Sequence, residues 1–311
     1  MNKKILVVIG GPTCVGKSEI CLKLAKKFET DIISADSRQF YKELNIGVAK
    51  LKEEKLKEVK HHLINNRTIK QNYSIGEYQD DFEKISKKIF KTKDILFLCG
   101  GSGLYIESVC KGLNKIPKIK EGIRTKLYNE MEIDGLEKLS EKLKKIDYDS
   151  WKRIDIKNPR KVIRCLEVYF STKKTMSSFL QNKLKEKKFD TLYFFLNEKR
   201  NLLYEKINTR VEKMIKVGLQ DEVKKILELN KEIALDTIGY KEFDNFFNNE
   251  QTITETKDLI KRNTRRYAKR QITWFKSKKF IEINPNEISK IETLIKEKRE
   301  TKASLYNNKN N

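Results

Sequence analysis

Two patterns of hydrophobic and polar positions follow each other along the first hundred residues: continuous apolar runs and apolar residues at helical spacing. Continuous apolar runs typical of strands buried on both faces of a parallel sheet occupy residues 4–9, 31–35 and 94–99. Apolar residues recur at helical spacing in the neighbouring segments, over 17–28, 51–60 and 76–91. Strands that alternate with helices build parallel βαβ units, so we predict an α/β fold with a P-loop-type parallel sheet.

The pattern changes near Pro117. From about 118 to 188 the chain is helical and rich in Lys and Glu, and the next strand-like run is Thr191 to Leu196. We therefore predict a helical insertion at 118–190 within a core made of 1–117 and 191–300. Helical spacing resumes in two later segments, 199–230 and 254–279, and the Lys/Asn-rich end at 301–311 predicts a frayed tail.

Charge is the unusual feature of the composition. The 311 residues include 68 Lys and Arg against 44 Asp and Glu, a net charge of +24. This surplus favours a polyanionic partner, nucleic acid first and an anionic membrane surface second. The alternative is that the lysines are ordinary solvated faces of Lys/Glu-mixed helices. With 15 Phe and 12 Tyr the chain does not have a disordered composition.

Other compositional features exclude several classes. No run approaches the roughly 20 apolar residues of a membrane-spanning helix. The five cysteines contain no CxxC pair, so they indicate neither a disulfide framework nor a zinc site. We expect a cytoplasmic protein without a membrane partner.

The segment after the first strand matches the phosphate-loop pattern G-x-x-x-x-G-K-[ST], with a strand before it and a helix after it. Its residues are Gly11, Pro12, Thr13, Cys14, Val15, Gly16, Lys17 and Ser18. Backbone N–H groups of such a loop cradle phosphates, the lysine adds a charge, and the Ser18 hydroxyl can bind Mg²⁺. The pattern does not say which phosphate compound binds.

An acid typical of nucleotide hydrolases is missing at the end of the 94–99 strand, which runs into Gly100–Tyr105. Asp36 instead follows the 31–35 strand. The carboxyl ends of parallel strands form the binding crevice, so Asp36 is expected near the phosphate loop. It can act there as a Mg²⁺ ligand or general base, or simply cap a following turn.

The ordered set of motifs resembles the tRNA dimethylallyltransferase (IPP transferase) family. Matching segments follow the phosphate loop in order over residues 5–275, at Asp36–Tyr41, Gly47–Lys50, His61–Leu63, Gly100–Tyr105, Asn158–Glu167, Ile238–Glu242 and Ala268–Trp274. The phosphate loop alone is unspecific, whereas this series in this order is highly specific.

The resemblance implies transfer of a dimethylallyl group from its diphosphate to N6 of adenosine 37, beside the anticodon of tRNAs that read codons beginning with U. The loop then cradles diphosphate, with Lys17 and Mg²⁺ stabilising the leaving group. Asp36 matches the family's base, Thr13 lies close to the transferred group, and Arg210 matches an arginine that we assign to diphosphate.

The resemblance also implies tRNA contacts. The adenosine must leave its stack to react. The positions that match tRNA-contacting residues are Asp36, Ser37, Arg38, Gln39, Ser102, Arg124, Arg160, Lys161, Val162, Ile163 and Arg164. Ser102 stands where the family usually has Thr, and it keeps the hydroxyl. The expected partners are the anticodon stem-loop and dimethylallyl diphosphate, bound by a monomer.

Two other classes stay open on the residues alone. A nucleoside or nucleotide kinase would use the same loop but needs an arginine-bearing lid, and a non-catalytic P-loop RNA-binding protein would tolerate loss of Asp36. The His61–His62 pair is interpreted as structural.

The charge surplus is concentrated at 261–279, which has nine basic residues and no acid. Four of these basic residues fall near one helical stripe suited to a phosphate backbone, Arg262, Arg266, Lys269 and Arg270.

Overall fold

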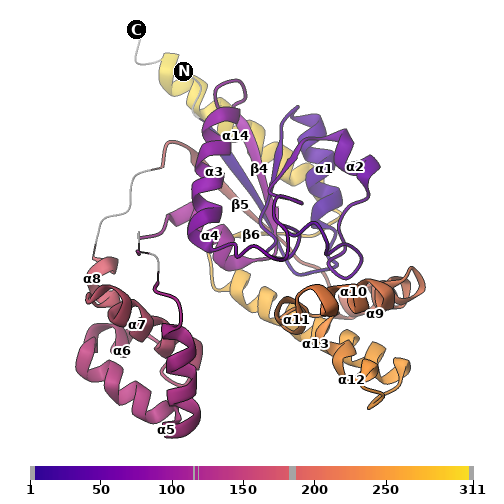
Figure 1. Cartoon of the computed structure of the whole chain (residues 1–311). Coiled ribbons are helices and arrows are strands. Elements are labelled where there is room, and N and C mark those ends of the chain that lie inside the picture. The colour runs from indigo at the N-terminus through magenta and orange to yellow at the C-terminus, as the bar shows by residue number, and fades with distance from the viewer. Residues whose placement is uncertain (1–3, 115, 118, 182–186, 308–311) are drawn as a thin grey trace. The chain divides into compact units, whose positions relative to one another are not determined.

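The protein is described here by a computed structural model that covers residues 4–114, 116–117, 119–181 and 187–307, with side chains described as far as residue 300. The chain forms two compact units (Figure 1). One consists of Met1–Cys110 and Lys187–Asn311, and we call it the core unit. The other, Lys111–Glu186, is the insertion. It begins and ends a few residues earlier than the 118–190 segment expected from the sequence.

The core unit is built on a six-stranded sheet in which every neighbouring pair is parallel, as the sequence predicts. Its strands in spatial order are β3 (His61–His62), β2 (Ile32–Ser34), β4 (Ile95–Gly100), β1 (Ile5–Gly10), β5 (Asp190–Leu196) and β6 (Ile281–Ile283). The sequence pattern missed β3 and β6. Both are short edge strands, His-His and Ile-Glu-Ile, and neither forms a continuous apolar run.

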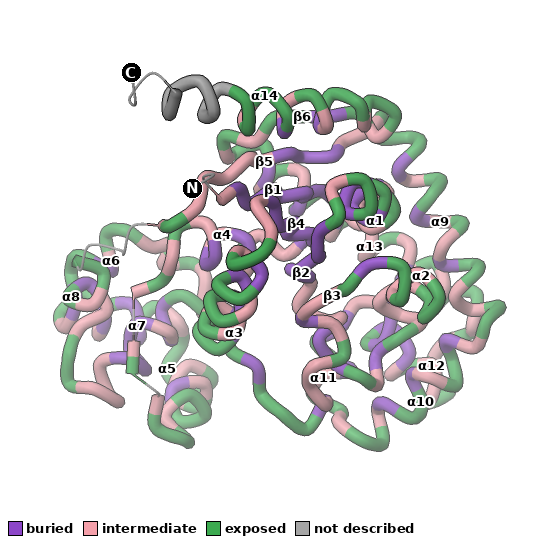
Figure 2. The backbone as a smooth tube through the Cα atoms, turned by 90° about the horizontal axis from the view of Figure 1, so that it is seen from above, coloured by how far each residue is buried: buried purple, intermediate pink, exposed green. Residues whose placement is uncertain are grey.

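The central strands are buried on both faces, which explains their continuous apolar runs (Figure 2). On one face, Val7 and Ile9 of β1 pack with helices α1 and α14, and on the other Leu6 and Val8 pack with α3 and α4. These helices are α1 (Lys17–Lys27), α3 (Ile75–Ile89), α4 (Gly103–Lys111) and α14 (Ile288–Asn307). Because α14 is helical to Asn307, the tail expected from 301 is helical that far, and 308–311 lie outside the described residues.

A helical layer with its own hydrophobic cluster completes the core unit. Its elements are α9 (Arg200–Lys216), α10 (Leu219–Leu229), α11 (Lys231–Leu235), a 3₁₀ turn η1 (Lys241–Phe243), α12 (Asp244–Phe247) and α13 (Ile253–Lys276). Helix α13 starts at a capping box in which Thr252 and Glu255 satisfy each other's backbone N–H groups. A short helix, α2 (Glu53–Glu58), lies between β2 and β3 along the chain.

The insertion is entirely helical where it is described, and its elements are α5 (Ile123–Ile146), α6 (Tyr148–Arg153), α7 (Pro159–Thr172) and α8 (Met176–Leu180). Its core includes Leu139 and Leu143 of α5 and Leu166 of α7. Asn158 caps α7 by accepting the N–H of Arg160. In the described part of the chain, no helix combines the length and apolar character needed to cross a membrane.

Candidate active site

The phosphate loop leaves the end of β1 and leads directly into α1. Gly16 takes a left-handed conformation (φ 95°) at the start of α1, which a residue with a side chain rarely adopts. It has no side chain with which to cap the helix, so the first N–H groups of α1 are left for an anion. The loop therefore has the geometry of an anion cradle.

Lys17 lies against this loop. Its Nζ donates a hydrogen bond to the Pro12 carbonyl over 2.6 Å. Burial lowers the pKa of Lys17, with Arg210 adding to this effect and the Asp36 carboxylate opposing it. Lys17 thus interacts electrostatically with two charged groups that come from other elements of the chain. A desolvated ammonium beside an arginine needs an anionic partner, which diphosphate would supply.

Thr13 connects the loop to two helices far along the chain. Its backbone N–H donates to Gln271 Oε1 of α13 over 2.9 Å. Its hydroxyl accepts a long hydrogen bond of 3.4 Å from Arg210 Nη1 of α9. Arg210, which the resemblance assigns to diphosphate, thus lies beside the phosphate loop.

Asp36 follows β2 at the carboxyl edge of the sheet. Its Oδ1 accepts the N–H of Arg38 over 3.0 Å, so it does cap a turn. Its other oxygen makes no hydrogen bond to the described residues. The next N–H, that of Ser37, donates to Ser102 Oγ over 3.1 Å, which joins this turn to the start of α4. Turn capping and proton transfer are therefore compatible roles for the same carboxylate.

Arg38 and Gln39, the next residues of this segment, also have hydrogen-bond partners. Arg38 Nη2 donates to the Asp236 carbonyl over 2.9 Å and pairs with the Asp236 carboxylate over 2.5 Å. Gln39 Nε2 donates to the Val48 carbonyl over 3.2 Å. Both side chains are half-buried, so they border the site from one side.

Two residues at the site were not assigned a role from the sequence. Tyr267 of α13 lies beside Ser102, and burial together with the nearby Asp36 carboxylate raises its pKa to about 12. Gln271 lies one helical turn further along and is nearly fully buried. Gln271 falls within a matching motif and could have been found there, whereas Tyr267 precedes that motif and gives no signal of its own.

The exposed side of α13 bears the basic stripe formed by Arg262, Arg266, Lys269 and Arg270. None of the four has an ion pair with a described residue. Other basic side chains of 261–279 are engaged: Lys261 pairs with Glu212, and Lys278 pairs with Glu107 over 3.1 Å. The stripe is thus available to an external polyanion, as expected from the sequence.

A pocket of about 810 Å³ opens next to the loop. Cys14 of the loop and Arg210 of α9 line it, together with several lysines, the acidic Glu198 and Glu205 and the apolar Leu202. This volume is in the range of small-molecule pockets.

The insertion places its predicted residues differently. Arg124 of α5 and Arg164 of α7 both bind the buried carboxylate of Glu167, Arg124 through Nε and Nη2 at 2.8 and 2.9 Å. Burial opposes ionisation of Glu167, but the hydrogen bonds from Arg124 and Arg164 outweigh it and lower its pKa. Val162 and Ile163 are buried in the core of the insertion, so their side chains face α5 rather than solvent.

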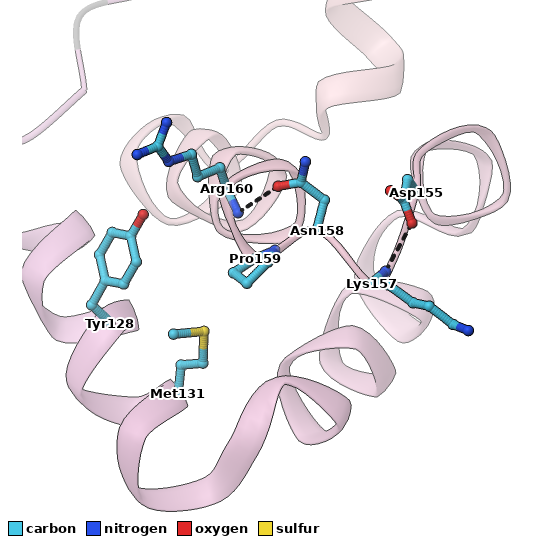
Figure 3. A pocket seen from close by; sticks show the side chains of 7 residues that line it. All are labelled: Tyr128, Met131, Asp155, Lys157, Asn158, Pro159 and Arg160. Carbon is cyan, nitrogen blue, oxygen red and sulfur yellow. Dashed lines mark hydrogen bonds between the residues drawn. The ribbon is translucent and has the colours of Figure 1, made fainter. Parts of the chain in front are cut away.

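Arg160 and Lys161 are exposed at the start of α7. A shallow pocket of about 670 Å³ lies there, with Arg160 on the side of Tyr128 and Lys157 on the opposite side (Figure 3). Of the five consecutive residues predicted to contact tRNA, these two are the most accessible.

Comparison with known proteins identifies the family. The model of the IPP transferase family matches residues 39–278. A tRNA dimethylallyltransferase from Christiangramia forsetii is 40% identical over 87% of this chain and 90% of its own length. The chain belongs to the IPP transferase family.

Solved structures extend this similarity to the whole fold. The tRNA isopentenylpyrophosphate transferase of Bacillus halodurans has a TM-score of 0.70 at 34% identity, covering 98% of this chain and 99% of that one. A eukaryotic dimethylallyltransferase acting on tRNA has a TM-score of 0.77 at 25% identity, covering 92% and 75%. These matches confirm the predicted family and α/β fold. The phosphate loop precedes the segment that the family model matches.

Proposed function

We propose that this protein transfers a dimethylallyl group from dimethylallyl diphosphate to N6 of adenosine 37 in tRNA. The observation that carries the proposal is an anion-cradling loop whose Lys17 interacts electrostatically with both Arg210 and Asp36 and whose Thr13 contacts Arg210. Cations on a phosphate loop suit a diphosphate leaving group, and a carboxylate beside them suits removal of a proton. Membership of the family supports the same activity.

The reaction breaks the C–O bond between the dimethylallyl carbon and the diphosphate and forms a C–N bond to N6. The diphosphate leaves with the electron pair of the C–O bond, and its growing negative charge is stabilised by the N–H groups of the loop, Lys17 and Arg210. The alkylated amine becomes acidic, and Asp36 accepts its proton. The products are N6-(dimethylallyl)adenosine and diphosphate.

Mg²⁺ fits this site as a partner of diphosphate. The Ser18 hydroxyl at the start of α1 makes no hydrogen bond to the described residues, and a hard cation prefers oxygen ligands. Within the described residues no group of three His, Cys, Asp or Glu side chains gathers as a metal site. Ser18 would therefore hold Mg²⁺ together with phosphate oxygens and water, and the ion would neutralise leaving-group charge.

The target adenosine has to leave its stack to reach the loop, since N6 is otherwise inaccessible to the donor. Ser37, Arg38, Gln39 and Ser102 surround Asp36 and are proposed to receive the anticodon loop. The basic stripe of α13 is proposed to bind the tRNA backbone, as are the exposed basic residues of the insertion. We further propose that the enzyme acts as a cytoplasmic monomer on tRNAs that read codons beginning with U.

The test is a transfer assay. Purified full-length protein is incubated with Mg²⁺, dimethylallyl diphosphate and unmodified tRNA that has adenosines at positions 36 and 37. Nuclease digestion and mass spectrometry should show one dimethylallyl group on adenosine 37. Parallel reactions with ATP in place of the donor, and with a tRNA that lacks adenosine 37, should show no product. Turnover of ATP without any prenylated adenosine would refute the proposal and favour a kinase.

A further inference from the structure

Helix α13 is seated on the carboxyl edge of the sheet by contacts from residues 271–275, which span little more than one helical turn. A Cβ atom at Gly10 would lie 2.2 Å from the Phe275 ring, and one at Gly103 would lie 2.4 Å from the Trp274 ring. The strand ends β1 and β4 and the start of α4 therefore approach α13 as closely as glycine allows. This side of α13 is buried and largely apolar, whereas its basic stripe is exposed.

Gln271 is the polar member of this contact. It is 7% exposed, and both ends of its amide are used. Oε1 accepts the Thr13 N–H over 2.9 Å, and Nε2 donates to the Gly101 carbonyl over 2.9 Å. One side chain thus joins the phosphate loop, the end of β4 and α13. Each bond satisfies a backbone group that the turn geometry of its own segment leaves without a partner.

We propose that Gln271 is a positioning residue for the transfer reaction. It holds Thr13 against the end of β4, which keeps the Thr13 hydroxyl and the N–H groups of the loop aimed at the diphosphate. The Thr13 hydroxyl also meets Arg210, so a loop released from Gln271 would lose its alignment with that cation. The inference rests on the proposed function. It adds a residue that touches neither substrate but sets the geometry of the groups that do.

Two variants break this link from different sides. Gln271→Met keeps the length of the side chain and removes both hydrogen bonds. Gly101→Ala leaves Gln271 in place but puts a Cβ 2.2 Å from its Nε2, which displaces the amide, and 3.2 Å from the Gly11 carbonyl oxygen, which has to shift slightly. If one variant folds poorly, the other still tests the link. The matched control is Gln251→Met, because the Gln251 amide also makes two hydrogen bonds, to the Glu242 carbonyl and to Thr256 Oγ1, each of 2.6 Å.

Single-turnover and steady-state transfer are measured for all variants alongside the unaltered protein. We expect Gln271→Met and Gly101→Ala to lower kcat roughly 10- to 100-fold, as a misplaced reacting group does, with KM for tRNA unchanged. Gln251→Met should keep its rate. If the unaltered protein shows no transfer, the proposed function fails. If it transfers normally and Gln271→Met matches Gln251→Met, only the positioning role of Gln271 fails.

A double-mutant cycle with Thr13→Val separates positioning from general destabilisation. Thr13→Val removes the hydroxyl but keeps the N–H that Gln271 holds. If Gln271 acts by placing that hydroxyl, Gln271→Met should lower the rate far less in the Thr13→Val background than in the unaltered protein. Fold reductions in rate that simply multiply in the double variant would overturn the proposal.

Discussion

The two units of the molecule present positive charge to polyanions by different means. In the core unit, backbone N–H groups and one desolvated lysine form a cradle that hydrogen bonds from distant segments hold in place. In the insertion, two partly exposed arginines, Arg124 and Arg164, both pair with the buried carboxylate of Glu167. The first arrangement suits a small anion that must be held at a defined place for chemistry. The second suits phosphates on a surface, where affinity matters more than the position of one atom.

The largest expected effect is a loss of transfer rate in the core unit while tRNA binding is retained. Asp36→Ala should bind tRNA nearly normally and lose about 10²–10⁴-fold in single-turnover rate, because the alkylated amine loses its proton acceptor. Asp36→Asn is the sharper variant. It keeps an oxygen for the Arg38 N–H and so preserves the turn, while a neutral amide cannot take the proton.

The two Asp36 variants together isolate the proton transfer from the turn. Filter binding gives the tRNA affinity and rapid quench gives the rate. Similar losses of rate in both variants, with affinity retained, indicate a base. A collapse of tRNA binding with unchanged single-turnover chemistry would show that Asp36 only shapes the turn.

The next effect concerns the carboxylate beneath the arginines of the insertion. Glu167→Gln leaves Arg124 and Arg164 without a counter-charge. Breaking a fully buried pair costs about 3–5 kcal/mol, but both arginines reach solvent here, so we expect about 1–3 kcal/mol of lost stability. The affinity for tRNA should fall as well, whereas binding of inorganic diphosphate to the core unit should not change.

The two tryptophans provide separate reporters for this comparison, since Trp151 lies in the insertion and Trp274 in the core unit. Denaturation of full-length Trp274→Phe protein followed by fluorescence reports on the insertion. Glu167→Gln should shift that transition and spare the one reported by Trp274 in a Trp151→Phe protein. Equal shifts in both would show that the units do not differ in their dependence on Glu167.

A smaller effect follows from pH. The arginines hold the folded pKa of Glu167 below its unfolded value of about 4.3. A group with a depressed folded pKa stabilises the protein above the unfolded value, and this stabilisation is lost as the pH falls through the folded value. The stability of the insertion should therefore drop below about pH 4.3, and Glu167→Gln should flatten that drop. An unchanged acid limb in the variant would assign the acid sensitivity to another carboxylate, such as Asp147.

The difference between the units also explains what the sequence could and could not predict. The phosphate loop is a contiguous pattern, and its strand-loop-helix context lies within about twenty residues, so both its place and its geometry follow from local rules. Strands β1, β2, β4 and β5 were likewise predicted from their continuous apolar runs. The two edge strands were not, because His-His and Ile-Glu-Ile form no continuous apolar run.

Contacts between distant segments lay beyond sequence reasoning. Gln271 and Thr13 are 258 positions apart in the sequence, and neither local sequence predicts the hydrogen bond between them. In the insertion, the run 160–164 was predicted as a block of tRNA contacts. A helix distributes successive residues around its axis, so the same run sends Arg160 and Lys161 outward and Val162 and Ile163 into the core. Helical spacing alone was sufficient to expect that division.

The smallest expected effect probes the exposed stripe of α13 as a simple electrostatic surface. Each lysine or arginine that neutralises a phosphate releases counterions, which contributes about 0.7–0.9 to the slope of log affinity against log salt concentration. Lys269→Ala should therefore weaken tRNA binding a few-fold, lower this slope by that amount and leave the single-turnover rate at saturating tRNA unchanged. The matched control is Lys87→Ala, which removes the same charge from the exposed side of α3. Equal slopes for the two variants would mean that tRNA responds to net charge alone and that the stripe on α13 is an ordinary solvated face.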